Sequence, residues 1–286
     1  MEAKAVDPDE FREGQRTQWN TAATGWRKWS ELIDTAASGV SERLVELAGV
    51  GPGSSVIDIG AGYGEPSLSA ARTAGPDGNV VAVDPSAEMI GFGRERVAAA
   101  GVDNIEFIEA NAFGVNFPED TFDAALSRWG IIFDPDGEGA AAVVRGFMKK
   151  GGRMAISSWG PPDRTPMLGI PMRTAMSELG VDPPPPGTPG PLSRPSGEAL
   201  GGLLKGGGFT DIQAEETEVT FEWDSPEDFT TYVKEIAPPI TAMLAPHPAE
   251  VQERTWSAIT EAIRKTADED GRVRQTNQVW LASGQA

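Results

Sequence analysis

Residues 56–66, VIDIGAGYGEP, decide the fold of this 286-residue chain. The stretch begins with four residues typical of a buried strand and continues into a loop with glycine at every second position. Pro66 then stands where the first turn of a helix tolerates proline. Because glycines let the backbone approach a ligand where side chains would collide, we expect a nucleotide-like ligand over the carboxyl end of this strand.

Short runs rich in β-branched residues recur about every 25 residues from this stretch onward. They lie at Val56–Ile59, Val80–Val83, Ile105–Ile108, Phe122–Ser127 and Met154–Trp159. Helical stretches separate these runs, and this rhythm is typical of βαβ units with right-handed crossovers. The sequence therefore predicts an α/β fold with a Rossmann-like, doubly wound sheet, whose cofactor-binding core occupies residues 51–160.

The first fifty residues predict a helical cap. Trp19, Ala22, Trp26, Trp29 and Ile33 recur at helical spacing, and Ser41–Gly49 offers a capping residue, an apolar stripe and a final glycine. Gly51-Pro52-Gly53 ends the helix. The cap would cover residues 1–50.

The chain beyond Gly160 predicts a lid and the completion of the sheet. Eleven of the 23 prolines lie between Pro161 and Pro195, including the run 183–186, so residues 161–195 read as a lid with one short helix near Met172–Leu179. Residues 196–286 would add the last strands, with a helical insertion at 225–270. The expected elements are the helix Gly197–Lys205, the strand Phe209–Trp223, the helices Pro226–Ile236 and Ala249–Lys265, and a strand around Gln278–Ala282.

Composition excludes several classes of function. Lys and Arg number 24 against 43 Asp and Glu, a net charge of −19 that repels nucleic acid and anionic membrane surfaces. The chain has no Cys and one His, which leaves thiolate and histidine-rich metal sites without ligands. We find no apolar leader and no long apolar run, so we expect a cytoplasmic protein without stable membrane insertion. The shortage of Lys among the basic residues fits either a salt-tolerant source or a high-GC genome.

Charge around the glycine loop indicates which nucleotide it holds. A dinucleotide site needs a third glycine at position 65, where this chain has Glu65, and no G-K-[ST] follows. A carboxylate there, with Asp58 nearby, opposes phosphate. S-adenosylmethionine carries no phosphate and has a cationic sulfonium and amine. In addition, Asp84 ends the second strand twenty residues beyond Gly64, where a carboxylate can accept both ribose hydroxyls. The sequence therefore predicts an S-adenosylmethionine site and no metal.

The chain resembles the class I S-adenosylmethionine-dependent methyltransferases, in the branch related to ubiquinone/menaquinone biosynthesis C-methyltransferases. The resemblance rests on VIDIGAGYGEP (56–66), VVAVDPS (80–86), EANAF (109–113), FDAALSRWGIIFDPD (122–136) and MKKGGRMAISSWG (148–160), and it covers nearly the whole chain. It implies a seven-stranded sheet with a reversed last strand. The cofactor-binding residues that we predict are Asp58, Gly60, Ala61, Gly62, Gly64, Asp84, Pro85, Met89, Asn111, Ala112, Phe113, Ser127 and Arg128.

Within that set, the resemblance places the glycines under the cofactor, Asp84 on the ribose, residues 111–113 beside adenine, and residues 127–128 near the methionine end. Two residues depart from the family pattern. Asn111 replaces a usual Asp, but its carbonyl oxygen can still accept from the adenine amine. Lys150 replaces a common Pro in the turn before Gly151, which affects loop rigidity rather than chemistry.

Methyl transfer from a sulfonium needs mainly proximity and alignment, with a base only where the acceptor must lose a proton. Candidate catalytic residues are His247, Tyr63 and Arg128, and other candidate bases are Tyr232, Glu65 and Glu235. His247 is either a base or a solvent-exposed bystander, and Tyr63 either touches the cofactor or only packs. Arg128 either anchors a carboxylate of cofactor or substrate, or pairs with Asp134 or Asp123.

Aromatic and aliphatic side chains predict an apolar acceptor pocket. Its candidate residues are Trp19, Trp26, Trp29, Trp129, Tyr232, Ile236 and Met243. The N-terminal tryptophans are either core contacts or a wall of this pocket.

We therefore expect a methyltransferase that acts on a carbon or oxygen of a small hydrophobic acceptor such as a quinone precursor, polyketide or terpenoid, as a monomer or homodimer. The alternatives are an S-adenosylmethionine-binding protein with a pericyclase-like or regulatory role, and an NAD-type oxidoreductase.

Overall fold

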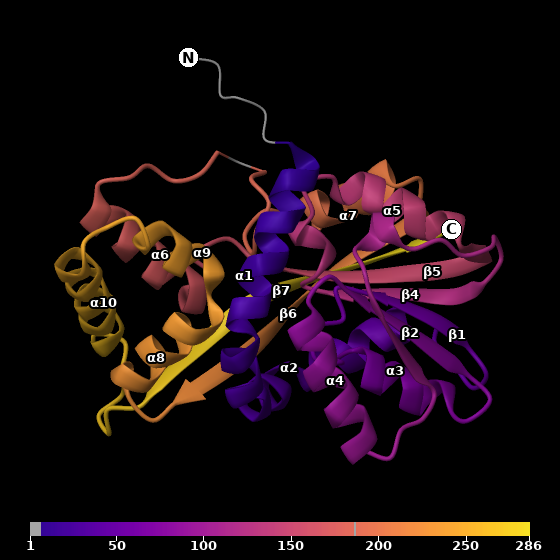
Figure 1. Ribbon diagram of the computed structural model, residues 1–286, viewed down its shortest axis with the longest axis horizontal. Helices are drawn as coiled ribbons and strands as arrows, with labels where there is room; N and C mark the ends of the chain where they lie inside the picture. The colour runs from indigo at the N-terminus through magenta and orange to yellow at the C-terminus, as the bar shows by residue number, and fades with distance from the viewer. Residues whose placement is uncertain (1–6, 186) are drawn as a thin grey trace.

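The computed structural model describes residues 7–185 and 187–286, and its centre is a seven-stranded sheet in the order β3-β2-β1-β4-β5-β7-β6 (Figure 1). The strands are β1 (Ser55–Ile59), β2 (Asn79–Asp84), β3 (Ile105–Glu109), β4 (Phe122–Arg128), β5 (Met148–Trp159), β6 (Thr210–Trp223) and β7 (Val273–Gln285). Strands β1 to β5 pair in parallel, and β7 runs antiparallel to both β5 and β6. The predicted Rossmann-like sheet with a reversed last strand is confirmed.

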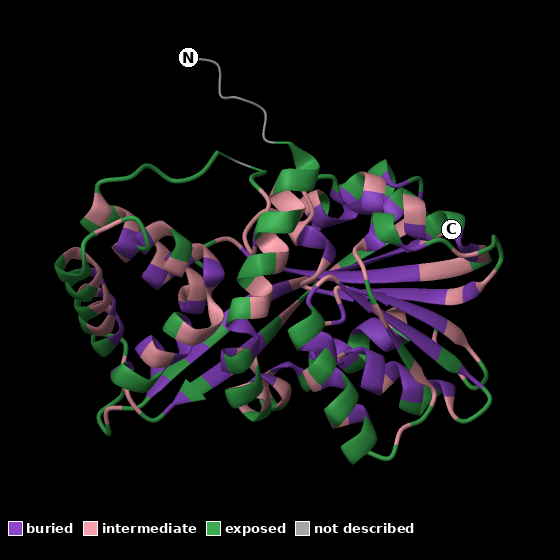
Figure 2. Ribbon diagram, viewed as in Figure 1, coloured by how far each residue is buried: buried purple, intermediate pink, exposed green. Residues whose placement is uncertain are grey.

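Helices cover both faces of the sheet because its strands bury side chains on both. One face carries α2 (Ser30–Leu47), α3 (Ser67–Ala74) and α4 (Ala87–Ala99), and the other carries α5 (Gly137–Gly146) and α7 (Gly197–Gly206). Alternation along β1 shows the two cores: Val56 packs with Leu44 of α2, and Ile57 packs with Val144 of α5. Figure 2 shows the strands buried between exposed helix surfaces.

A second helical group lies beyond the far end of the long β6–β7 pair, at the left of Figure 1. It consists of α6 (Pro166–Leu179), α8 (Pro226–Ile236), α9 (Pro238–Leu244) and α10 (Ala249–Arg264). Helix α6, from the segment predicted as a lid, packs against α10, from the segment predicted as an insertion. The two segments therefore build one helical layer. The long helix α1 (Pro8–Lys28) crosses between this layer and the sheet.

Several predicted boundaries differ from the structure. Ser41 does not cap a helix: α2 begins at Ser30, and Ser41 is buried in its middle. Helix α6 begins six residues before the predicted Met172: Pro166 lies in its first turn, where proline is tolerated, and Pro171 lies inside the helix at the cost of one backbone hydrogen bond. Strands β5 and β7 are longer than predicted: the added start of β5 pairs with β4 at Met148, and the added start of β7, from Val273, pairs with β6.

Among the described residues, no helix is long and apolar enough to cross a membrane. Residues 1–6 and Pro186, which belong to the predicted N-terminal cap and the proline run, lie outside the described part of the chain. The domain division, the cytoplasmic location and the monomer-or-homodimer state stay predictions.

Candidate functional site

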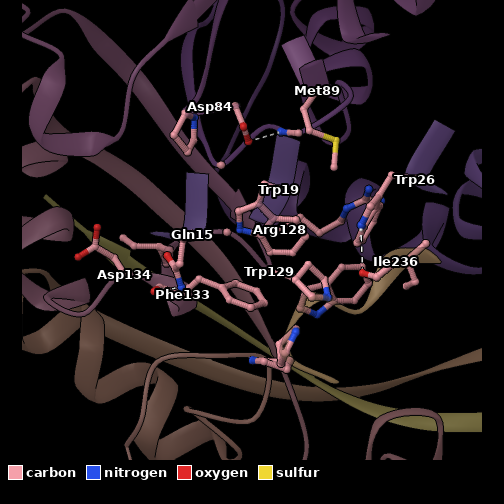
Figure 3. Close-up of a pocket in the computed structure, with 18 of the residues that line it drawn as sticks. Gln15, Trp19, Trp26, Asp84, Met89, Arg128, Trp129, Phe133, Asp134 and Ile236 are labelled. Atoms are coloured by element: carbon pink, nitrogen blue, oxygen red, sulfur yellow. Dashed lines mark hydrogen bonds between the residues drawn. The ribbon is translucent and has the colours of Figure 1, made fainter. Parts of the chain in front are cut away.

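A cavity of about 400 Å³ lies at the carboxyl ends of β1, β2 and β4, between the sheet, α1 and the second helical group. Parallel strands bring their carboxyl ends together at one edge, and the strand order reverses direction between β1 and β4, which is where open α/β sheets bind ligands. Figure 3 shows Asp84 and Met89 at one end of the cavity and Trp129 and Ile236 at the other.

The glycine loop after β1 forms the floor of the cavity. Gly60 and Gly62 have φ values of 71° and 54°, which favour glycine, and the backbone N–H of Gly60 donates to Val83 on β2. A Cβ on Gly60 would lie 2.7 Å from Cα of Gly130, whereas a Cβ on Gly62 would point into open space. Gly60 therefore lets two loops touch, and Gly62 leaves room for a ligand. Ala61 also lines the cavity, but Gly64 does not and instead packs near Phe107.

Asp84 is the buried acid at the end of β2, and it lines the cavity with Pro85 and Met89. Its two carboxylate oxygens accept from the backbone N–H groups of Gly62 and Ser86, both at 2.8 Å. Each oxygen keeps a further lone pair for a ligand donor. Burial raises the pKa of Asp84 to about 6, against the two backbone hydrogen bonds, which lower it.

Asp58, which the sequence predicts to contact the cofactor, does not line the cavity. The side chain is fully buried beneath the glycine loop, where one oxygen accepts from Ser67 Oγ at 2.5 Å and Oδ1 has no partner among the described residues. Burial raises its pKa to about 7.

Only part of the segment after β3 lines the cavity. Asn111 and Ala112 line the cavity, but Phe113 is exposed outside it, where the guanidinium of Arg12 lies 4.3 Å above its ring. Asn111 Oδ1 accepts from the backbone N–H groups of Phe113 and Gly114. The sequence predicts that this oxygen accepts from the adenine amine, but both of its lone pairs are already used. The group that Asn111 keeps for a ligand is its Nδ2 donor.

The turn after β4 is fixed by two buried serines. Ser127 Oγ donates to Ile59 O at 2.7 Å and accepts from Ile131 N, and Ser157 Oγ accepts from Trp129 N. Ser127, which the sequence predicts to contact the cofactor, thus positions the turn and does not itself line the cavity. Trp129 has a φ of 53°, an uncommon value for a bulky residue, and its side chain lines the cavity.

Arg128 is buried, with 7% of its surface exposed, and lines the cavity. Its Nη1 donates to Ser41 Oγ at 2.9 Å, and among the described residues no carboxylate pairs with it. Both ion-pair alternatives are wrong, because Asp134 pairs with Arg12 and Asp123 pairs with Lys149. A buried guanidinium with free donors is a site for an anionic group.

The two predicted catalytic residues Tyr63 and His247 lie in different places relative to the cavity. Tyr63 lines the cavity, but its hydroxyl donates to Asp34 at 3.1 Å, and burial raises its pKa well above the usual range. His247 follows α9 outside the cavity, and its backbone carbonyl accepts from Gln252. Of the other candidate bases, Glu65 accepts from Ser69 Oγ, and Glu235 is paired with Lys28 away from the cavity.

The residues predicted for the acceptor pocket divide into those that line the cavity and those that do not. Those that line the cavity are Trp19, Trp26, Trp129, Tyr232 and Ile236. Trp29 lies behind this wall, where its ring meets Tyr232 edge to face, and Met243 packs against the core without reaching the cavity. The N-terminal helix is therefore both a core contact and a wall of the cavity.

Several residues that line the cavity were not predicted from the sequence. Helix α1 adds Arg12 and Gln15, which bind Asp134 and the backbone oxygen of Phe133 across the opening. Helix α6 adds Met167, Leu168 and Met172. The spacing of Arg12 and Gln15 ahead of Trp19 on one helical face is the signal that could have found the first pair. No local pattern marks the second group.

Comparison with known proteins shows what the central part of the chain is similar to. Residues 56–152 match the family described as "Methyltransferase domain". The chain is 31% identical over 141 residues to the ubiquinone/menaquinone biosynthesis C-methyltransferase UbiE of Teredinibacter turnerae, covering 47% of this chain and 57% of the relative. It is 36% identical over 116 residues, 41% of each chain, to an uncharacterized protein of Mycobacterium tuberculosis.

The part of the chain that holds β1 to β5 is therefore similar to a methyltransferase domain. The chain spans about two fifths to three fifths of the length of these curated relatives. Its fold is similar to phosphoethanolamine N-methyltransferase 2 of Haemonchus contortus in complex with S-adenosyl-L-methionine, with a TM-score of 0.52 and 20% identity, over 86% of this chain and 52% of that one.

The chemistry of the cavity fits S-adenosylmethionine. Open space lies above Gly62, a buried carboxylate lies at the end of β2, and a buried guanidinium lies at the end of β4. Glu65 lines the cavity beside the loop, where it would oppose the phosphates of a dinucleotide.

Proposed function

We propose that this protein transfers the methyl group of S-adenosylmethionine to a carbon or oxygen of a small hydrophobic acceptor. One observation carries the proposal: a single cavity joins the polar glycine loop and Asp84 to an apolar chamber lined by Trp159, Met172 and Tyr232. A cofactor held at the first end would present its reactive group toward the second. A binding or regulatory protein would not need that connection.

The residues of the glycine loop and β2 would hold the adenosyl part of the cofactor. The free lone pairs of Asp84 are available to the ribose hydroxyls, and the space above Gly62 admits the cofactor backbone. Asn111 Nδ2 can donate to a ring nitrogen of adenine. Bound in this way, the cofactor supplies an electrophilic methyl group on a sulfonium.

Arg128 would hold the carboxylate of the cofactor's methionine. Its guanidinium lies on the same side as the glycine loop, since Tyr63 of that loop and Ser41 of α2 are its neighbours. Hydrogen bonds between ionised partners are about twice as strong as neutral ones and have a defined direction. Arg128 would thereby fix the rotation of the methionine chain and aim the sulfonium at the chamber.

The residues that line the cavity contribute alignment and exclusion of water rather than a base. Tyr63 and Tyr232 are buried and keep their protons, because burial raises the pKa of both well above the usual range. Among the described residues that line the cavity there is no histidine. Proximity and orientation are sufficient for transfer to an acceptor that is already nucleophilic.

The test is to incubate the purified protein with S-adenosylmethionine and a panel of quinols, phenolic polyketides and terpenoid alcohols, and to follow S-adenosylhomocysteine by mass spectrometry. We expect acceptor-dependent product that carries one added methyl group. Tight binding of S-adenosylhomocysteine in calorimetry without turnover on any acceptor would favour the pericyclase-like or regulatory alternative. Binding of NAD in place of S-adenosylhomocysteine would favour the oxidoreductase.

A further inference from the structure

The central residues of the glycine loop are not held by backbone hydrogen bonds. The N–H groups of Gly60 and Ala61 donate to one carbonyl of β2, and Gly64 N donates to Ala61 O. Among the described residues, neither Gly62 nor Tyr63 makes a hydrogen bond to another backbone group. Gly62 and Gly64 lie on either side of Tyr63, and glycine can adopt many other conformations. The conformation of residues 62 and 63 therefore depends on side chains.

Tyr63 makes the contacts that hold this part of the loop. Its hydroxyl donates to Asp34 Oδ1 of α2 at 3.1 Å. Arg96 of α4 donates to both partners, through Nη1 to the backbone oxygen of Tyr63 at 3.0 Å and through Nη2 to Asp34 Oδ2. Asp34, Tyr63 and Arg96 thus form a closed ring of hydrogen bonds, which we call the loop clamp.

The ring of Tyr63 is also fixed by its aromatic and cationic neighbours. It stacks on Phe92 of α4, with 5.8 Å between the ring centroids and 21° between the planes. The guanidinium carbon of Arg96 lies 4.6 Å from the centre of the Tyr63 ring, and the ring of Trp26 lies 5.9 Å away. Tyr63 lines the cavity, whereas Asp34, Phe92 and Arg96 do not. The loop clamp therefore acts on the cavity from outside, through one residue.

The effect of the loop clamp reaches Asp84 through Gly62. The N–H of Gly62, the residue before Tyr63, donates to Asp84 Oδ2 at 2.8 Å. It is one of the two backbone hydrogen bonds to this carboxylate, and the other comes from Ser86. A displacement of Tyr63 would move Gly62 away from the carboxylate and change the open space above the loop.

The ion pair in the loop clamp is partly exposed, with 31% of the Asp34 side chain and 19% of the Arg96 side chain accessible. Exposed ion pairs add little to the stability of a fold, because water and salt screen them. A guanidinium can nevertheless hold two acceptors in a fixed geometry, which an ammonium cannot. The pair is therefore better suited to fixing the direction of the loop than to stabilising the whole fold.

We propose that Asp34 and Arg96 are positioning residues of the cofactor half of the cavity, the half that contains the glycine loop and Asp84. Through Tyr63, they hold the loop in the conformation that keeps Gly62 N–H on the carboxylate and leaves space for the cofactor. This inference rests on the proposed function and deepens it, because it adds to the cofactor site two residues that do not line the cavity.

The test is calorimetry of S-adenosylhomocysteine binding between pH 5 and pH 8 in Arg96→Lys, which keeps the charge and loses the two-point geometry. We expect binding about three- to tenfold weaker at pH 8, the value of one hydrogen bond. The hydrogen bond from Gly62 lowers the pKa of Asp84, which is about 6. Loosening the loop should therefore raise that pKa and move the midpoint of the pH dependence upward by about half a unit.

Two further variants separate the clamp from charge and from packing. Tyr63→Phe removes the hydroxyl without changing the charge, and it should shift affinity and midpoint in the same directions. Arg27→Lys is the matched control, because Arg27 pairs with Glu95 of α4 and lies 5.1 Å above the Phe92 ring without a hydrogen bond to the loop clamp. It should keep wild-type values. The elements around Asp84 also carry ionisable residues that every variant leaves unchanged: Arg16, Asp58, Glu65, Glu88, Glu109 and Arg128.

Carbon-13 NMR of the Asp84 carboxyl group, assigned with Asp84→Asn, measures the same pKa without any ligand. We expect a higher value in Arg96→Lys and Tyr63→Phe than in the wild type and Arg27→Lys. An unchanged pKa in both clamp variants would overturn the inference, even if their affinity falls. If thermal unfolding shows that Arg96→Lys does not fold, Tyr63→Phe decides alone. If the wild type does not bind S-adenosylhomocysteine, the proposed function fails, and the NMR titration still decides the inference.

Discussion

The two halves of the cavity are built in different ways. The cofactor half consists of the ends of β1, β2 and β4, so its residues lie at or directly after the ends of buried strands. Backbone hydrogen bonds fix Asp84, and a hydrogen bond to Ser41 fixes Arg128. The acceptor chamber is the apolar half of the cavity, and its residues come from the turn after β4 and from β5, β6, α6 and α8. Two of them, Trp129 and Tyr232, are 103 residues apart in the sequence. Sheet topology determines the first half, and packing between distant helices determines the second.

The first and largest predicted effect comes from filling the cofactor half of the cavity and leaving the acceptor chamber unchanged. Gly62→Val fills the open space above the loop and introduces a side chain at a φ of 54°. We expect binding of S-adenosylhomocysteine to fall more than a hundredfold in calorimetry. The matched control is Gly53→Val, at a φ of 80° with no atom within 4 Å and far from the cavity, which should keep wild-type affinity. Retained binding in Gly62→Val would contradict the role of the loop.

The second prediction concerns Asp84. Removing its carboxylate with Asp84→Ala should weaken S-adenosylhomocysteine binding by about 1.5–3 kcal/mol, the value of charged hydrogen bonds to the ribose. Because the pKa of Asp84 is about 6, the wild-type affinity should also fall as the pH decreases from 8 to 5 and the carboxylate gains its proton. Calorimetry at several pH values checks both effects. Unchanged affinity in the variant would exclude the contact with ribose.

The third prediction separates the two ends of the cofactor. Arg128→Met should weaken binding of S-adenosylhomocysteine by about 1.5–3 kcal/mol, because a charge-assisted contact to its carboxylate is lost. Binding of 5′-methylthioadenosine, which lacks the amino-acid part, should be unchanged in the same variant. Equal losses for both ligands would show that Arg128 supports the fold of the site and does not hold the carboxylate.

The sequence predicted the cofactor half far better than the acceptor chamber. Residues 56–66 and Asp84 follow strands that hydrophobic runs reveal, so their convergence at one sheet edge could be inferred. Ser127 and Asp58 share that local pattern, yet they point beneath the loop, and the direction of a side chain at a strand end is not encoded in the motif. Met167 and Met172 line the chamber because α6 packs on α10. These two helices are far apart in the sequence, and no local pattern predicts their contact.

The fourth prediction uses the buried acid beneath the loop. The pKa of Asp58 is about 7 in the folded protein and about 3.8 in the unfolded chain, so between these values the folded state binds the additional proton. Stability from this group is therefore present at low pH and lost as the pH rises through 7. Asp58→Asn should remove this loss. In urea unfolding the wild type should lose about 2–4 kcal/mol more than the variant between pH 5 and pH 8. Equal losses would show that Asp58 is ionised throughout.

The smallest expected effect concerns the contact that holds α1 over the cofactor half of the cavity. Arg12 binds Asp134 through two hydrogen bonds of 3.0 and 2.9 Å, with 14% and 13% of the side chains exposed. Arg12→Lys keeps the charge and loses the two-point geometry, so S-adenosylhomocysteine affinity should fall about threefold, or about 0.7 kcal/mol. Arg43→Lys is the control, since Arg43 also makes two hydrogen bonds to one carboxylate, that of Glu215, and neither residue lines the cavity. A similar loss in both variants would argue against closure by α1.

The central claim is that one cavity joins a cofactor cradle to an acceptor chamber, and a crystal structure of the S-adenosylhomocysteine complex tests it most directly. The account predicts the ribose on Asp84, the carboxylate on Arg128 and the open side of the sulfur facing Trp129 and Tyr232. A complex in which the sulfur faces Asn111, or in which the ligand lies outside the cavity, would contradict it.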